Sequence, residues 1–100
     1  MTTLRKVDKS PLYQGEDESI AYTFEWAAVG TPTNPAVALK DYNMNDKSAT
    51  CLSGVASVVG TTVVTPLVKS LTAGVIYRLE CKVTITGNIF EAYCLIHGED

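Results

Sequence analysis

Residues 77–85 read YRLECKVTI, and TGN follows at residues 86–88; this stretch decides the fold. Its apolar and polar side chains alternate without interruption, so Tyr77, Cys81 and Ile85 share one face and the charged side chains share the other. This period of two predicts a β-strand with one face in a core. Gly87 and Asn88 have the chemistry of a two-residue hairpin turn, which predicts that the next strand returns antiparallel.

The returning segment, residues 89–96, reads IFEAYCLI and is apolar on both faces. A strand that packs only one face on a core has no need of apolar residues on the other. We therefore expect the outward side chains Ile89, Tyr93 and Leu95 to meet a partner, and we take them as the candidate interaction surface.

A second alternating stretch, IAYTFEW, occupies residues 20–26. It places Tyr22, Phe24 and Trp26 on one face, which predicts another half-buried strand with Trp26 as the central core residue. The alternative is that these three rings form an exposed platform for stacking on a sugar. Their alternation with polar residues favours the core.

Shorter β-prone segments fill much of the remaining chain, in which Val, Ile and Thr make up 28 of the 100 residues. Pro66 cannot donate a ladder hydrogen bond, so its strand is expected at a sheet edge or bulged. Six to eight short strands separated by turn signals predict an all-β fold, an antiparallel β-sandwich of about seven strands. The length predicts a single domain, residues 1–100, with flexible termini at 1–10 and 97–100. The other expected strands cover residues 4–7, 36–39, 48–53, 56–59 and 61–71.

One feature refines the type of sandwich. The glycine turn LTAG, residues 71–74, comes directly before the strand that Tyr77 opens. In immunoglobulin-like sandwiches a tyrosine near the start of the penultimate strand folds back and hydrogen-bonds the preceding loop. Tyr77 is the candidate for this role, and the alternative is that it is simply another inward-facing aromatic residue.

Charge and hydropathy exclude several classes of function. Eight basic against eleven acidic residues give a net charge of −3, which lacks the basic footprint of a nucleic-acid-binding protein. No apolar run approaches the ~20 residues of a membrane span. The N-terminal MTTLRKVDK is followed by SPLYQG rather than by an apolar run, so we expect no signal peptide and a cytoplasmic location.

The three cysteines, Cys51, Cys81 and Cys94, fit that location. They are odd in number and form no CxxC pair, as expected of free thiols in a reducing compartment. A disulfide between Cys81 and Cys94 stays an alternative, because neighbouring strands could bring them together.

Metal-binding patterns are weak. Cys94 and the sole histidine, His97, are three residues apart, which places them on opposite faces of a strand. The acidic cluster 16–18 (EDE) could bind calcium with help from Asp41 or Asp46, but a solvated loop is the preferred interpretation. We therefore expect no metal and no cofactor.

Catalytic patterns are equally weak. The carboxylates Glu25, Glu80 and Glu91 fall on outward strand positions, which indicates solvated surface rather than a catalytic cleft. A cysteine nucleophile would need Cys51 or Cys81 close to His97 together with an orienting group. We expect no catalytic residues, and hence no enzyme.

Two stretches together resemble a known family. DESIAYTFEW at residues 17–26, and TAGVIYRL at 72–79 followed by VTITG at 83–87, resemble segments of small proteins encoded among the virion genes of tailed phages and prophages. The resemblance covers residues 11–97 and is loose over 36–60, where the family usually has a tryptophan that this chain lacks. It implies an immunoglobulin-like sandwich without catalytic residues.

The expected function follows from that resemblance. It implies a non-enzymatic structural or accessory protein that contacts other virion proteins or itself, located in the bacterial cytoplasm during assembly and in the virion afterwards. The alternative is an immunoglobulin-like module that binds carbohydrate or a cell surface.

Overall fold

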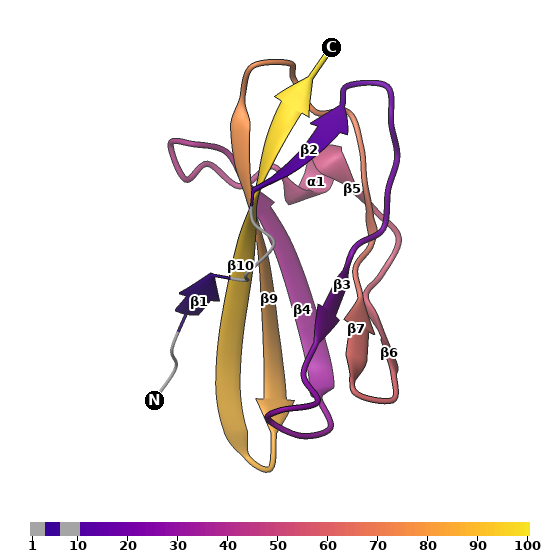
Figure 1. The fold of residues 1–100 in the computed structure, drawn as a ribbon, viewed down its shortest axis with the longest axis vertical. Helices are drawn as coiled ribbons and strands as arrows, with labels where there is room; N and C mark the ends of the chain where they lie inside the picture. Colours follow the sequence, from indigo (N-terminus) through magenta and orange to yellow (C-terminus); the bar gives the residue numbers. More distant parts are fainter. Residues whose placement is uncertain (1–3, 7–10) are drawn as a thin grey trace.

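The computed structural model describes residues 4–6 and 11–100, and it shows an all-β protein with one short helix (Figure 1). The molecule is elongated, measuring 40 × 23 × 23 Å. Its elements are β1 (Leu4–Lys6), β2 (Leu12–Gly15), β3 (Thr23–Glu25), β4 (Thr33–Lys40), α1 (Ser48–Cys51), β5 (Leu52–Ser53), β6 (Ser57–Val59), β7 (Thr62–Val64), β8 (Leu67–Val68), β9 (Ile76–Ile85) and β10 (Asn88–Glu99).

The larger layer is built on the long antiparallel hairpin of β9 and β10, as the alternation in residues 77–85 predicts. The edge strand β4 pairs antiparallel with β9, and the N-terminal strands β1 and β2 both pair parallel with β10. The position of the hairpin turn differs from the prediction. Ile85 pairs with Asn88, so the two turn residues are Thr86 and Gly87, with φ angles of 50° and 80°.

This register separates two cysteines. Cys81 lies opposite Ala92, and Cys94 lies opposite Leu79, so the two thiols are diagonal neighbours on the inner face. Diagonal positions of an antiparallel pair are ~7–8 Å apart, too far for a disulfide without backbone movement. All three cysteines are free and buried.

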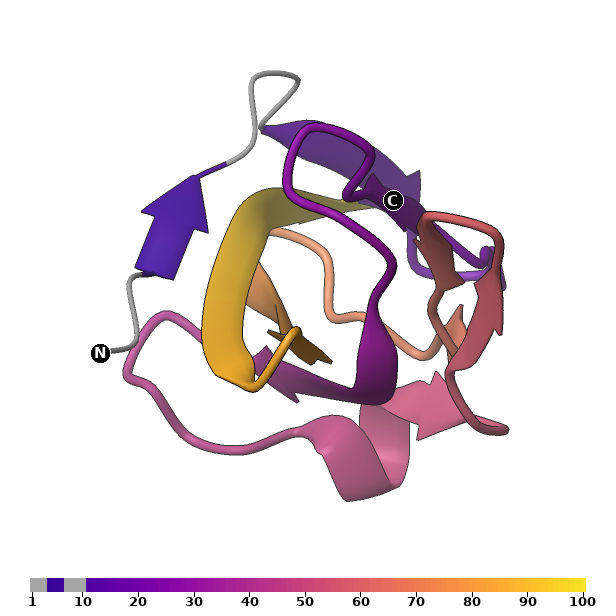
Figure 2. The same ribbon diagram turned by 90° about the horizontal axis from the view of Figure 1, so that it is seen from below.

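The second layer contains β3-β7-β6 and the short pair β5-β8. Seen along the long axis, β10 and the β6–β7 hairpin lie on opposite sides of the molecule (Figure 2). The expected strand 61–71 is interrupted near Pro66 into β7 and β8, and β7 is the middle strand of its sheet rather than an edge. At the break, Thr65 exchanges backbone and side-chain hydrogen bonds with Tyr22.

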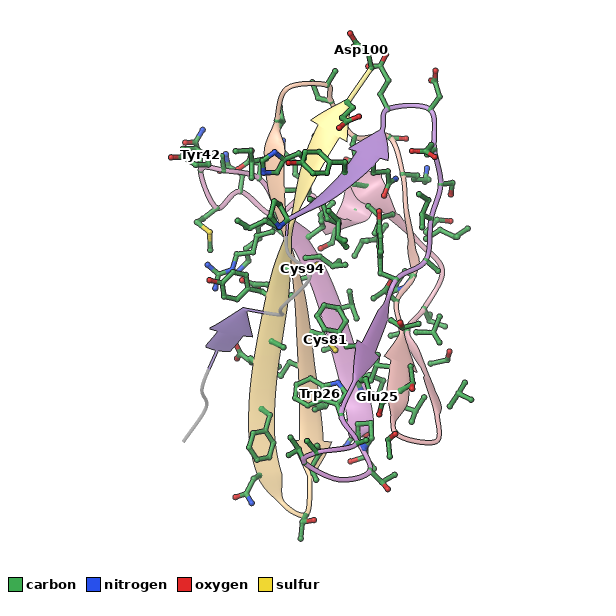
Figure 3. All side chains as sticks on the ribbon, in the orientation of Figure 1. Glu25, Trp26, Tyr42, Cys81, Cys94 and Asp100 are labelled. Carbon is green, nitrogen blue, oxygen red and sulfur yellow. The ribbon has the colours of Figure 1, made fainter. Side chains whose placement is uncertain are left out.

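The core lies between the layers and contains the inward residues of β9, from Tyr77 to Ile85, together with Phe24 and Trp26. Trp26 and Cys81 are adjacent there (Figure 3). The Tyr77 hydroxyl accepts a hydrogen bond of 2.8 Å from the Thr72 backbone N–H, so the tyrosine ties its strand to the preceding loop in the predicted way.

At the two ends of the chain, the structure differs from two further expectations. Residues 97–99 are not a tail: they belong to β10, where Gly98 exchanges backbone hydrogen bonds with the loop at Gly74 and Val75. Most of the expected N-terminal flexible segment lies outside the described residues, and Leu4–Lys6 within it forms β1.

Two strands expected in the middle of the chain also differ from those in the structure. Residues 48–51 of the expected strand 48–53 form α1, and only 52–53 are β-structure. The expected strand 36–39 is longer, because β4 begins at Thr33 and passes through a bulge before Ala36.

Candidate interaction surface

The solvent-facing side of β4, β9 and β10, here called the outer face, carries all three residues of the predicted interaction surface. Ile89, Tyr93 and Leu95 alternate along β10 with the buried residues Ala92 and Cys94, so they project away from the core. Ile89 is 45% exposed, whereas Tyr93 and Leu95 are half-buried. The structure thus brings the three together on one face but gives them different surroundings.

Tyr93 is held by a charged neighbour. The Arg78 guanidinium lies over the Tyr93 ring, 4.0 Å from its centroid, which is cation–π geometry. The same guanidinium is 2.9 Å from the Glu80 carboxylate, which also lies 3.2 Å from the Lys40 ammonium group. This network fixes an aromatic ring and a cation beside each other on β9 and β10.

A groove of about 480 Å³ runs beside this network on the outer face. It exists because β4 contributes only the short side chains of Ala36 and Ala38 next to long side chains on β9. Its rim is amphipathic and is formed by Lys40, Met44, Arg78, Glu80, Lys82 and Glu91.

The loop 41–47 borders the groove. The Asp41 carboxylate accepts hydrogen bonds from the backbone N–H groups of Asn43 and Asn45, which shapes the loop and lowers the pKa of Asp41. Tyr42 and Met44 project from it, 77% and 50% exposed, and Tyr42 points away from the body of the molecule (Figure 3).

Two further hollows continue the groove past this loop. One of about 190 Å³ shares Met44 and Arg78 with the groove and reaches Leu95, and one of about 420 Å³ extends to Gly74. The outer face is therefore a continuous hollowed surface with apolar and charged groups side by side.

Three of the carboxylates considered for metal binding, Glu18, Asp41 and Asp46, have structural partners. Glu18 accepts a hydrogen bond from the Gly15 backbone N–H, and Asp46 accepts one from the Ser48 backbone N–H. The Ser48 hydroxyl, together with this N–H, lowers the pKa of Asp46. Among residues 4–6 and 11–100, no three His, Cys, Asp or Glu side chains are grouped to hold a metal ion. Cys94 faces the core, whereas His97 packs edge-on against Tyr13 outside, with 5.1 Å between ring centroids.

The thiols are not activated. Burial raises the pKa of Cys81 to about 12, against a smaller lowering effect of the Trp26 indole, and raises that of Cys94 to about 11. Burial also raises the pKa of Cys51. Thiols with raised pKa values are protonated near neutral pH and are poor nucleophiles.

The three aromatic residues considered as an alternative platform for stacking on a sugar have other positions in the structure. Phe24 and Trp26 are buried in the core, and the half-buried Tyr22 donates its hydroxyl hydrogen to the Gln14 side chain at 2.7 Å. The three rings therefore do not form an exposed platform for stacking.

Sequence reasoning predicts a polar turn at residues 41–47 but does not link it to the interaction surface, and it misses the alanine floor of the groove. Neither has a strong sequence signal, because a polar loop and two alanines are common in any chain. The alternation Ala36-Val37-Ala38-Leu39 does place both alanines on one face, and this is the signal that could have located the floor.

Comparison with protein families and with curated proteins finds no match to this chain. Within the described residues, no helix is long and apolar enough to cross a membrane.

Proposed function

We propose that the sandwich is immunoglobulin-like. Such domains place strands C, F and G in one sheet and strands B, E and D in the other. Here β4, β9 and β10 take the C, F and G positions in chain order, and β3, β7 and β6 take the B, E and D positions. The Tyr77 bond to the loop before β9 supports the same assignment. The chain departs from the constant-type pattern in its first strands, which pair with β10.

We further propose that the chain is a non-enzymatic accessory protein of a phage or prophage that works by binding another virion protein through its outer face. The observation that carries the proposal is the amphipathic groove on the outer face, whose rim includes the Arg78 that lies over Tyr93. Ile89 is exposed on the same face of β10. A solvent-facing tyrosine beside an arginine is a typical anchor of protein interfaces. The phage assignment rests on the resemblance of residues 17–26 and 72–87.

The partner chemistry follows from the rim. Lys40, Arg78 and Lys82 stand beside Glu80 and Glu91, so the groove offers both signs of charge around an apolar floor. This arrangement fits a folded protein surface with complementary charges and one inserted apolar side chain. A uniformly acidic polymer would fit it less well.

The test uses two substitutions on the outer face, Ile89→Lys and Tyr93→Lys. Tyr93→Lys also places a cation beside Arg78, so both variants put an unpaired charge where a partner must be desolvated. We expect each to reduce the amount of the protein in purified particles at least tenfold, measured by quantitative mass spectrometry.

Val29→Lys is the matched control, because Val29 is a similarly exposed aliphatic residue that lies in the connection between β3 and β4 rather than on β4, β9 or β10. We expect it to enter particles as the unmodified chain does. Circular dichroism and urea unfolding verify that all three variants are folded. Incorporation of a folded Tyr93→Lys variant at the normal level would remove the outer face from the proposal.

A further inference from the structure

The edges of the two larger sheets are not equally protected. One edge of β10 is covered by β1 and β2. The free edge of β4 carries Pro35 and a bulge, and Leu39 at its end bonds to Lys47 and Ser48. The last residue of β3 is the charged and exposed Glu25. Prolines, bulges, charges and covering segments are the devices that keep strand edges from pairing with other chains.

The edge of β6 has none of these devices. All three of its residues, Ser57, Val58 and Val59, are exposed, and the preceding Val55 is 85% exposed. β6 ends its sheet, and Figures 1 and 2 show it at the outside of the molecule. No charged residue occurs anywhere from residue 48 to residue 68.

The hydrogen-bonding direction of β6 can be followed from its neighbour. The Trp26 N–H donates to the Thr61 carbonyl, and Phe24 pairs with Val63. Thr61, just before β7, and Val63, within it, therefore turn their peptide groups toward β3. Thr62 and Val64 therefore turn theirs toward Val59 and Ser57. The N–H and C=O of Val58, between those two, point away from the sheet.

We propose that two copies of this chain associate through β6, antiparallel about a two-fold axis at Val58. The Val58 N–H of each copy donates to the Val58 carbonyl of the other, which joins the two β3-β7-β6 sheets into one sheet of six strands. An antiparallel pair of identical strands is self-complementary, as a two-fold interface requires. Because the strand is uncharged, no like charges meet across the axis, which favours a second copy as the occupant.

Pairing at Val58 fixes which residues of the two copies lie opposite each other. With Val58 opposite Val58, Ser57 of one copy lies opposite Val59 of the other, and this cross-strand pair occurs twice. Both side chains point outward from their own sheet, since the intervening Val58 pairs with the buried Val63. Charges introduced at 57 and 59 therefore meet each other in the dimer without disturbing the core.

The experiment compares three double variants by sedimentation over a range of concentrations. Ser57→Lys with Val59→Lys, and Ser57→Glu with Val59→Glu, place like charges opposite each other, so each should raise the dimer dissociation constant at least tenfold. Ser57→Glu with Val59→Lys places opposite charges together and keeps the net charge, so it should dimerise at least as well as the unmodified chain. An equimolar mixture of the two like-charged variants should form a heterodimer.

Two controls keep the test specific. Ile89→Lys should dimerise normally, since it lies on the outer face, and the Val58 amide should become more protected from hydrogen exchange as the concentration rises. The proposal is overturned if the unmodified chain stays monomeric at millimolar concentration. It is also overturned if the like-charged variants dimerise normally, or if the oppositely charged variant fails to dimerise while folded.

Discussion

At the scale of single residues, Gln14 does more than its position in the sequence indicates. It is completely buried, donates 2.6 Å and 3.0 Å hydrogen bonds to the carbonyl oxygens of Val68 and Glu18, and accepts one from Tyr22. It thereby joins β2 of one layer to β8 of the other. A glutamine in a segment rich in turn formers gives no sequence signal for this role, because the role depends on strands far away in the chain.

Replacing Gln14 by leucine should lower the free energy of unfolding by about 2–3 kcal/mol, since the Tyr22 hydroxyl and a backbone carbonyl lose their partners. Urea unfolding measures the loss. Tyr22→Phe should cost less, about 1 kcal/mol, and the double variant should cost less than the sum, because the hydroxyl is then no longer left unpaired. Additive losses would show that the two side chains act independently.

Three weak acids, Tyr22, Cys81 and Cys94, predict how the stability of the fold depends on pH. Burial, with smaller effects of Cys94 and Glu18, raises the pKa of Tyr22 from 10.0 to about 12, and burial raises Cys94 and Cys81 from 9.0 to about 11 and 12. The folded state holds these protons more tightly than the unfolded state does. The stability that they confer is therefore complete below pH 9 and is lost as the pH rises through 11 to 12.

Urea unfolding at pH 8 and pH 11 checks this expectation. A variant with Cys81→Ala and Cys94→Ala should be less stable at pH 8, because it has cavities in the core. Its stability should nevertheless fall less between the two pH values than that of the unmodified chain. An equal fall in both proteins would show that the thiols do not contribute.

At the scale of elements, the alternation of residues 77–85 predicted the strand β9, its hairpin with β10, and which side chains of β9 point inward. It could do so because strict alternation of apolar and polar residues is typical of a strand with one buried face. The alternation could not decide which two residues form the turn. Turns at Thr86-Gly87 and at Gly87-Asn88 differ by two positions in register, so both keep the same side chains inside. Only the Gly87-Asn88 register would set Cys81 opposite Cys94, which explains why the sequence left a disulfide open.

The observed turn predicts a stabilising substitution. Thr86 has a positive φ of 50°, which is unfavourable for a β-branched residue, and Asn-Gly is a preferred pair for a turn with two positive φ angles. Thr86→Asn should raise the free energy of unfolding by about 1 kcal/mol. Thr72→Asn, at an exposed threonine without a positive φ, should change it by less than ~0.5 kcal/mol. A loss of stability in Thr86→Asn would argue against the Thr86-Gly87 turn.

At the scale of the whole molecule, composition and alternation predicted an all-β chain with Phe24, Trp26 and Tyr77 inside. The outer face could be predicted only in part. Ile89, Tyr93 and Leu95 follow from the doubly apolar β10, whereas the groove beside them depends on β4 and the loop 41–47, which the fold alone brings to that face. The uncharged segment 48–68 becomes meaningful only once β6 is seen to lie at an open edge.

Cross-linking in assembled particles tests the proposal that the outer face binds a virion protein. A photoreactive amino acid replaces Ile89 in the chain during particle assembly, and the same substitution at Val29 serves as the control. Mass spectrometry of purified particles then identifies the cross-linked peptides. We predict a cross-link from position 89, and none from position 29, to one virion protein at a single site. Particles that lack the protein, or equal cross-linking from both positions, would contradict the claim.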